Sequence, residues 1–161
     1  ASRPRLAVIE ALLDAQIPVM GHVGLTPQSQ RIMGGYRVQG RQPEQAEAIV
    51  NDAVALDGAG CFAIVVECVP RGVASTITRS VKAPVIGIGA GPDCDGQVLV
   101  LGDLLGLTEG PMPRFVRRYA SLQADAVAAG AAFVADVRSG RFPSDDESYH
   151  SPESGLGPGP Q

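Results

Sequence analysis

The feature that most constrains this chain is the alternation of helical segments with short, uninterrupted apolar segments. The segments 18–21 (PVMG), 61–67 (CFAIVVE) and 84–89 (PVIGIG) lack the polar–apolar alternation of a strand with one face in water. Between them, apolar side chains recur at helical spacing. This order is typical of α/β proteins, in which parallel strands are buried on both sides by helices. We therefore predict an α/β fold of about four βα units.

Apolar spacing and end signals predict four helices. The first covers 6–18, and the second begins at Pro43, a favoured first helical position, and ends at the glycines of 58–60. The third runs from about Val73 to Val81, and the fourth from Phe115 to about Gly140. For the second helix we expect a buried stripe of Ala46, Ile49, Val50, Ala53 and Val54.

Three further segments complete the prediction. Residues 97–102 (QVLVLG) read as a fourth strand, with a short helix as the alternative. Residues 22–42 are polar and Gly-rich, and loops of this length in compact domains usually carry function or move. The tail 151–161 is rich in Pro, Gly and Ser and is expected to be disordered, so the predicted folded part is 1–150.

Composition excludes several classes of function. Net charge is −4 and aromatic residues make up 4%, which does not fit a nucleic-acid-binding surface. Arg114, Arg117 and Arg118 are expected to share one face of the fourth helix as solvated surface. The cysteines are odd in number and form no CxxC pair, which favours reduced thiols in the cytoplasm. No signal peptide is seen, and no stretch approaches the roughly 20 apolar residues of a membrane span.

Polar or Gly-rich residues follow three of the predicted strands. His22 ends the first strand, Glu67 ends the second, and the stretch 87–96 (GIGAGPDCDG) ends the third. Because parallel strands end at one edge of a sheet, where ligands bind in α/β folds, we expect the three to converge there. Glu67 has an alternative role as the partner of an arginine or the cap of the next helix, and His22 as a structural residue.

Two chemistries are disfavoured at this edge. The glycines in 87–91 suggest a dinucleotide loop, but Pro92 and Asp93 follow where that motif requires a helix, so the glycines are expected to let the backbone turn or approach a ligand. Lys82 is the only lysine and precedes Pro84, at the entry end of a strand, which argues against a Schiff-base aldolase. A metal-assisted enolate with a carboxylate base remains open.

Four long motifs carry a resemblance to a known family. In order, they are PVMGHVGLTPQS (18–29), GGYRVQGR (34–41), VVECVP (65–70) and PVIGIGAGPDCDGQVLVLGD (84–103). The chain resembles the ketopantoate hydroxymethyltransferases from about Ile9 to His150. The resemblance implies a TIM-type (β/α)8 barrel. It also implies transfer of a hydroxymethyl group from 5,10-methylenetetrahydrofolate to 3-methyl-2-oxobutanoate, giving 2-dehydropantoate in pantothenate and coenzyme A synthesis.

The resemblance also implies roles for single residues. Glu67 matches the proton acceptor that acts at C3 of the keto acid, and His22 matches a histidine that lines the substrate pocket. In this family Mg²⁺ stabilises the enolate, but its ligands and a VKxE motif would lie upstream of Ala1, so no metal ligand is assigned in this chain. Near the end, in DESY, Glu147 stands where the family has a histidine, which puts any role of that histidine in doubt.

A TIM barrel needs about 250 residues. The resemblance therefore implies that 1–150 form the C-terminal half of a barrel, strands five to eight, with open sheet edges that promote association. The expected partner is a separate N-terminal half-barrel, another copy in a homo-oligomer, or a segment missing from the sequence. The alternative is a truncated, non-catalytic chain that associates with a complete homologue. A third option, another enolate-forming lyase of the same barrel superfamily, fits the motifs less well.

Overall fold

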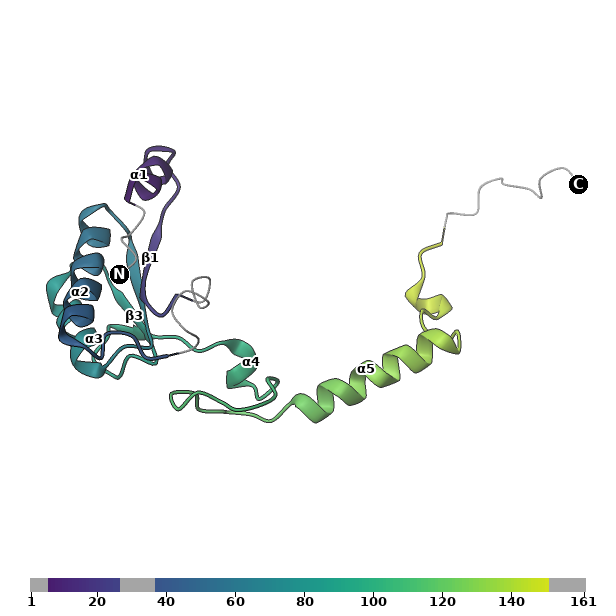
Figure 1. Ribbon diagram of the computed structural model, residues 1–161. Coiled ribbons are helices and arrows are strands. Elements are labelled where there is room, and N and C mark those ends of the chain that lie inside the picture. Colours follow the sequence, from purple (N-terminus) through teal and green to yellow (C-terminus); the bar gives the residue numbers. More distant parts are fainter. Residues whose placement is uncertain (1–5, 27–36, 151–161) are drawn as a thin grey trace, which may run out of the picture.

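The centre of the computed structural model, which describes residues 6–26 and 37–150, is a four-stranded sheet (Figure 1). All neighbouring strands pair in parallel, and they lie in the sheet in chain order. The strands are β1 (Met20–Gly24), β2 (Ala63–Glu67), β3 (Val85–Ile88) and β4 (Gly96–Gln97). The predicted α/β class with parallel strands is confirmed. The predicted tail at 151–161 lies outside the described residues.

Helices alternate with these strands as the spacing predicted. The helices before β4 are α1 (Leu6–Asp14), α2 (Pro43–Gly58) and α3 (Arg71–Ser80). The predicted fourth strand at 97–102 is wrong beyond Gln97. The chain leaves the sheet after two paired residues and forms the short α4 (Leu101–Leu104), which is the helical alternative.

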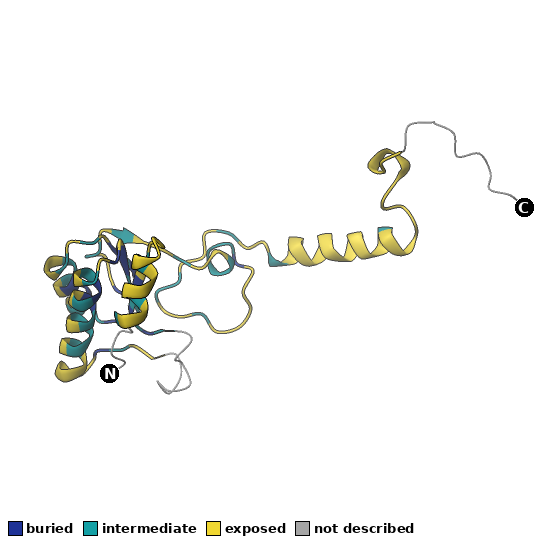
Figure 2. Cartoon of the chain, turned by 90° about the horizontal axis from the view of Figure 1, so that it is seen from above, coloured by how far each residue is buried: buried dark blue, intermediate teal, exposed yellow. Residues whose placement is uncertain are grey.

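The core lies between one face of the sheet and the helices α2 and α3. Ile64, Val66 and Val85 are 0% exposed, and they pack with buried side chains of α2 and α3. Burying one such aliphatic side chain stabilises the fold by about 1.5–3 kcal/mol. The prediction that Val54 belongs to the buried stripe of α2 is wrong, because its side chain is 43% exposed. Leu56, which is 3% exposed, is buried instead. Figure 2 shows the buried residues concentrated in this layer.

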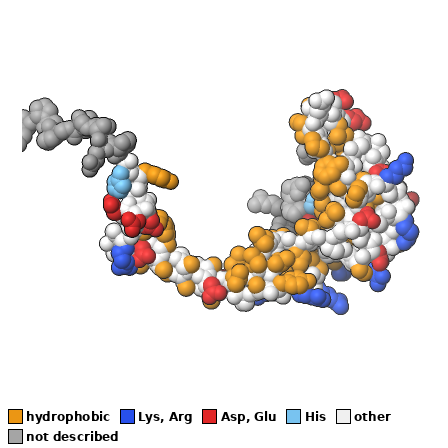
Figure 3. Space-filling view, turned by 180° about the vertical axis from the view of Figure 1, so that it is seen from behind, with side chains coloured by type: hydrophobic (Ala, Val, Ile, Leu, Met, Phe, Trp, Pro, Cys, Tyr) orange, Lys and Arg blue, Asp and Glu red, His pale blue; other side chains and the backbone are white. Residues whose placement is uncertain are grey.

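The opposite face of the sheet is not covered by any helix of the described residues. Met20 is 47% exposed there, and the other side chains that point to this side include His22, Val65 and Glu67, all of intermediate exposure. The prediction that helices bury both faces is therefore wrong for this part of the chain. The helix α1 lies at one end of the sheet, and Figure 3 shows hydrophobic side chains gathered on the side of the body that faces α5.

The predicted helix from Phe115 to Gly140 begins only at α5 (Gln123–Arg138). Residues before it are held against the α4 region, because the amides of Tyr119 and Leu122 donate to the carbonyls of Leu104 and Leu105. The helix α5 contains no buried residue and projects away from the body (Figures 1 and 2). Across 6–26 and 37–150, no helix has the length and apolar character needed to cross a membrane.

Candidate functional site

His22 and Glu67 meet on the uncovered face of the sheet. The His22 Nε2 atom lies 3.1 Å from Glu67 Oε2. In the register of the strands His22 is opposite Val65 and Gly24 is opposite Glu67, so side chains two residues apart point to the same side. The expectation that the two residues converge is confirmed. His22 nevertheless lies in the middle of β1 and not at its end, because pairing with β2 continues to Gly24.

One nitrogen of this pair has no hydrogen-bond partner in the described structure. The side chain of His22 is 29% exposed and that of Glu67 is 14% exposed. The two atoms lie at the distance of an ion pair, but no hydrogen bond joins them. The Nε2 atom is therefore a buried nitrogen without a hydrogen-bond partner in the described structure. A buried polar atom left unpaired costs about 1–3 kcal/mol. A ligand oxygen at this position would remove that cost.

The backbone around Glu67 fixes where its side chain begins. The Glu67 carbonyl accepts a hydrogen bond from the Leu25 amide at 2.9 Å, and the next amide, that of Cys68, donates to Ile88 at 2.9 Å. Cys68 itself has φ 50°, a left-handed conformation that is uncommon for any residue other than glycine and that often occurs at functional sites. The chain therefore turns sharply directly after the carboxylate, at the edge where the strands end.

The glycine-rich stretch after β3 is held by protein side chains from two directions. Gly89 has φ 64°, and a Cβ there would lie 2.7 Å from the ring of Phe115. Gly91 has φ 85°, and a Cβ there would lie 2.9 Å from Arg71 Cγ. The expectation that these glycines let the backbone turn is confirmed by their positive φ angles, while the close approach to a ligand stays a prediction.

An arginine clamps the same stretch. The Arg71 guanidinium donates two hydrogen bonds to the Asp93 carboxylate, at 2.6 and 2.9 Å, and the side-chain hydrogen bonding lowers the pKa of Asp93. The sequence analysis missed this pair and the Phe115 contact with Gly89. No local pattern could reveal them, since the two partners of each are more than 20 residues apart.

Two residues singled out in the sequence lie away from the pair. Lys82 precedes β3, at the amino edge of the sheet as predicted, and its backbone amide donates to Asp57 Oδ2. Glu147 lies in the short 3₁₀ helix η2 (Asp145–Glu147) beyond α5, where its carboxylate accepts a hydrogen bond from the Ser144 amide at 2.8 Å. That bond lowers the pKa of Glu147. Neither residue contacts His22 or Glu67.

The donor atoms at the site do not fit a magnesium ion by themselves. Mg²⁺ requires a near-octahedral set of ligands, mostly oxygen. Within the described ranges no group of three or more His, Cys, Asp or Glu side chains is placed to hold a metal. His22 and Glu67 supply one nitrogen and one carboxylate, and these two already contact each other. The described residues alone therefore do not provide a complete set of protein ligands for a metal ion.

A family model and curated relatives match this chain. The family model described as ketopantoate hydroxymethyltransferase matches residues 1–145. Curated proteins named 3-methyl-2-oxobutanoate hydroxymethyltransferase are similar to this chain. The protein from Koribacter versatilis is 56% identical over 92% of this chain and 50% of its own length. That from Pelobacter propionicus is 55% identical over 89% of this chain and 53% of its own length. The chain thus spans about half the length of these relatives.

Proposed function

Because the chain belongs to the ketopantoate hydroxymethyltransferase family, we propose that it supplies the proton-abstracting part of that enzyme's site. The reaction transfers a hydroxymethyl group from 5,10-methylenetetrahydrofolate to 3-methyl-2-oxobutanoate and gives 2-dehydropantoate, in pantothenate and coenzyme A synthesis in the cytoplasm. The observation that carries the proposal is the Glu67 carboxylate, 14% exposed at the end of β2 and 3.1 Å from His22 on an uncovered face.

Glu67 is the proton acceptor in this proposal. Its carboxylate takes the proton from C3 of the keto acid, and the electron pair of the broken C–H bond remains on the substrate as an enolate. The C3 carbon then attacks the one-carbon unit of the folate, so that a C–C bond forms, the C–N bonds to the folate break, water supplies the hydroxyl group and tetrahydrofolate leaves. His22 lines the substrate pocket, where its unpaired Nε2 is available to hydrogen-bond an oxygen of the keto acid.

Mg²⁺ is part of this proposal, with its ligands on residues outside this chain. When bound, the ion would stabilise the negative charge of the enolate. The described donors alone do not form its site. We propose that the chain is the C-terminal half of a TIM-type (β/α)8 barrel, strands five to eight. Its uncovered sheet face would then line the barrel interior, and the N-terminal half would add both the missing ligands and the missing strands.

Association is therefore expected at two surfaces. The uncovered face and the open edge of β1 suit an N-terminal half-barrel. The projecting α5 exposes Val127, Phe133 and Val137, each more than 40% exposed, which suits contact with another copy in a homo-oligomer.

The second candidate function is a non-catalytic chain that binds a complete homologue. The incomplete set of metal donors among the described residues favours it. Sedimentation as a stable monomer would contradict both expectations.

Proton exchange at C3 tests the proposed chemistry without any folate. The chain is mixed with the N-terminal half of the Koribacter versatilis relative, 3-methyl-2-oxobutanoate and Mg²⁺ in D₂O, and loss of the C3 proton signal is followed by NMR. We expect exchange with the unsubstituted chain and none with Glu67→Gln. The control is Glu47→Gln, the same change at an exposed position of α2.

The outcomes separate the two candidate functions. Exchange that persists at the normal rate in Glu67→Gln would refute the assigned base. Absence of exchange from a folded, associated mixture would favour the non-catalytic chain. Exchange by the chain alone would refute the proposal that the metal ligands lie outside it.

A further inference from the structure

The pairing of β2 with β3 ends beside the proposed base. Glu67 and Ile88 are its last register partners, and just beyond them the Cys68 amide donates to the Ile88 carbonyl at 2.9 Å. No further backbone hydrogen bond joins the two segments within the described residues. Hydrogen bonds at the end of an element open more readily than those in its middle. The backbone that carries Glu67 therefore stands at the weak end of this pairing.

Arg71 joins the two segments again after the last backbone hydrogen bond. Its guanidinium donates to the Asp93 carboxylate from Nε and from Nη2, at 2.6 and 2.9 Å. The backbone of Gly91 lies on the Arg71 side chain, since a Cβ at residue 91 would be 2.9 Å from Cγ and 3.0 Å from Cβ of that side chain. Two parallel hydrogen bonds fix the direction of approach as well as the distance. We call Arg71 and Asp93 the clamp.

The helix that begins at Arg71 does not explain an arginine at this position. The amino end of a helix carries a partial positive charge, so a cation in the first turn is unfavourable, and α3 has no acidic residue there to offset it. The Arg71 side chain is 67% exposed and so adds little to the core. Its carboxylate partner, Asp93, lies on the far side of the strand ends. The arginine is therefore explained by the two segments that it joins.

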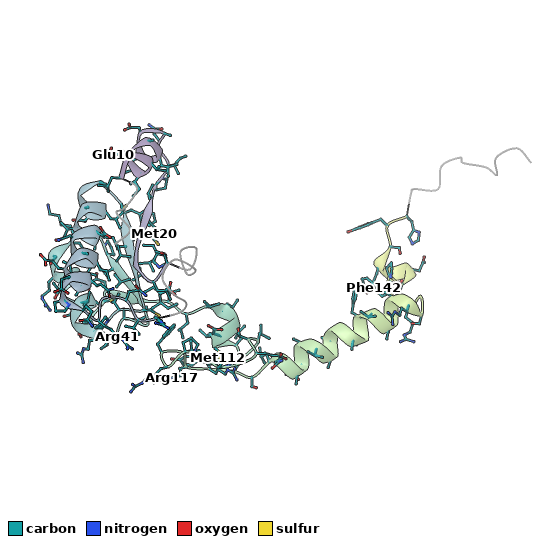
Figure 4. The ribbon with its side chains drawn as sticks, in the orientation of Figure 1. Glu10, Met20, Arg41, Met112, Arg117 and Phe142 are labelled. Carbon is teal, nitrogen blue, oxygen red and sulfur yellow. The ribbon has the colours of Figure 1, made fainter. Side chains whose placement is uncertain are left out.

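The other side of the Glu67–Cys68 backbone is held by two further segments. The Leu25 amide donates to the Glu67 carbonyl at 2.9 Å, and the Gln39 amide donates to the Cys68 carbonyl at 2.8 Å. Figure 4 shows Arg41, two residues beyond Gln39, at the end of the body away from α1. Toward β3 only the Cys68 amide makes a backbone hydrogen bond past the register pairs of the described strands, and the clamp is the next polar contact beyond it.

We propose that Arg71 and Asp93 are positioning residues that keep this strand end closed and so hold the Glu67 carboxylate where it takes the proton from C3. The inference rests on the proposed function, in which Glu67 is the base. No hydrogen bond or ion pair joins either side chain to Glu67 in the described part of the chain, so the clamp acts through the Cys68–Ile88 hydrogen bond. A reacting group displaced by about 1 Å can lose about a hundredfold in rate. A partial opening of the strand end should therefore slow proton abstraction.

Breaking the clamp tests the proposal in the enzyme assembled from this chain and the complementing N-terminal half. Asp93→Asn keeps the shape of the side chain and removes its charge. At saturating keto acid, C3 proton exchange should slow about three- to tenfold, with KM for the keto acid unchanged, because the clamp holds the base and not the substrate. Arg71→Ala should give a similar loss, and the double variant should lose no more than the slower single variant, because the two residues act as one unit.

The matched control is a second arginine–aspartate pair. Asp136→Asn breaks the similarly exposed pair with Arg141 at the end of α5 and should leave the C3 exchange rate unchanged.

Backbone hydrogen exchange gives a second readout that does not depend on turnover. It is measured on the same assembly by mass spectrometry with single-amide resolution. Deuterium uptake at the Cys68 amide should rise about two- to fivefold in Asp93→Asn. The Ile64 amide, which donates to the Pro84 carbonyl at the other end of the same pairing, should be unchanged.

The remaining outcomes each overturn the proposal. An equal rise in uptake at both amides would show a general loss of stability instead of a positioning role. A raised KM with an unchanged rate would assign the clamp to substrate binding, and additive losses in the double variant would refute action as a pair. A slower reaction without faster uptake at Cys68, or faster uptake with an unchanged rate, would refute the route through the strand end. If the unsubstituted assembly shows no C3 exchange, the proposed function itself fails, whatever uptake at Cys68 shows.

Discussion

Replacing Gly89 by alanine tests whether Phe115 holds the end of β3. Two costs follow from the structure. Gly89 has φ 64°, and the left-handed conformation costs a residue with a Cβ about 1–2 kcal/mol. The new Cβ would also lie 2.7, 2.9 and 3.0 Å from three atoms of the Phe115 ring, and overpacking of this kind costs about 1–3 kcal/mol. Gly89→Ala should therefore lower the free energy of unfolding by about 2–5 kcal/mol.

A second variant separates these two costs. In a Phe115→Ala background the ring is gone, so Gly89→Ala should cost only the backbone part, about 1–2 kcal/mol. Gly110→Ala is the matched control, because Gly110 has φ 90° and a Cβ there would meet nothing within 4 Å. It should likewise cost about 1–2 kcal/mol.

Urea unfolding followed by far-ultraviolet circular dichroism measures these differences, since the chain contains no tryptophan for a fluorescence signal. The expected coupling between Gly89→Ala and Phe115→Ala is about 1–3 kcal/mol. Costs that add to within about 0.5 kcal/mol would refute the contact between the ring and Gly89. A Gly110→Ala cost as large as that of Gly89→Ala would refute the division into a backbone part and a ring part.

Three further predictions concern the core, the clamp and the thiols. Ile64→Ala removes a fully buried side chain and should cost about 2–5 kcal/mol in urea unfolding, whereas Met20→Ala, on the uncovered face, should cost less than half as much. The hydrogen bond from Arg71 lowers the pKa of Asp93. The ionised Asp93 carboxylate therefore contributes fully to stability above its ordinary pKa of 3.8, and this contribution is lost as pH falls through the lowered pKa. Asp93→Asn should therefore be less stable than the unsubstituted chain at pH 6, and a difference that persists unchanged at pH 2 would contradict this. Burial raises the pKa of the Cys61 thiol, so Cys61 should react with a thiol reagent at pH 7 only after urea is added, and rapid labelling of the native chain would be inconsistent with the fold.

The sequence predicted those parts of the fold that depend on neighbouring residues. The helices α2 and α3 follow from their own apolar spacing, Pro43 and the closing glycines, and the buried runs of β2 and β3 from their composition. The end of β1 was misjudged because His22 is polar, while its strand conformation comes from pairing with β2, a segment some 40 residues later. The helical spacing from Phe115 to Gly140 predicted α5 correctly only from Gln123 onward. The residues before Gln123 donate their amide hydrogens to carbonyls of the α4 region and so do not continue the helix.

The candidate site, like the fold, could be predicted from the sequence only in part. Glu67 and His22 were found because each is a polar residue within or after an apolar strand, and parallel strands bring such positions to one side. The Arg71–Asp93 clamp joins residues 22 positions apart and leaves no local pattern. The uncovered face does not follow from the apolar runs, which look the same whether the covering layer belongs to the same chain or to another one; it is expected only from the resemblance, because half of a barrel exposes half of the barrel interior.

The order of the strands has a consequence for how the protein folds. Because β1, β2, β3 and β4 lie in the sheet as they lie in the chain, each pairing joins segments separated by a single connection. Each parallel pairing must close a long connection before its contacts form, so sheets of this kind form slowly compared with folds built from local helical contacts. Among the four described strands, the pairing of β1 with β2 is the first that synthesis makes possible, and it is the one that brings His22 to Glu67. His22 and Glu67 therefore meet through the pairing of two strands that are neighbours in the chain, and their contact does not depend on β3 or β4.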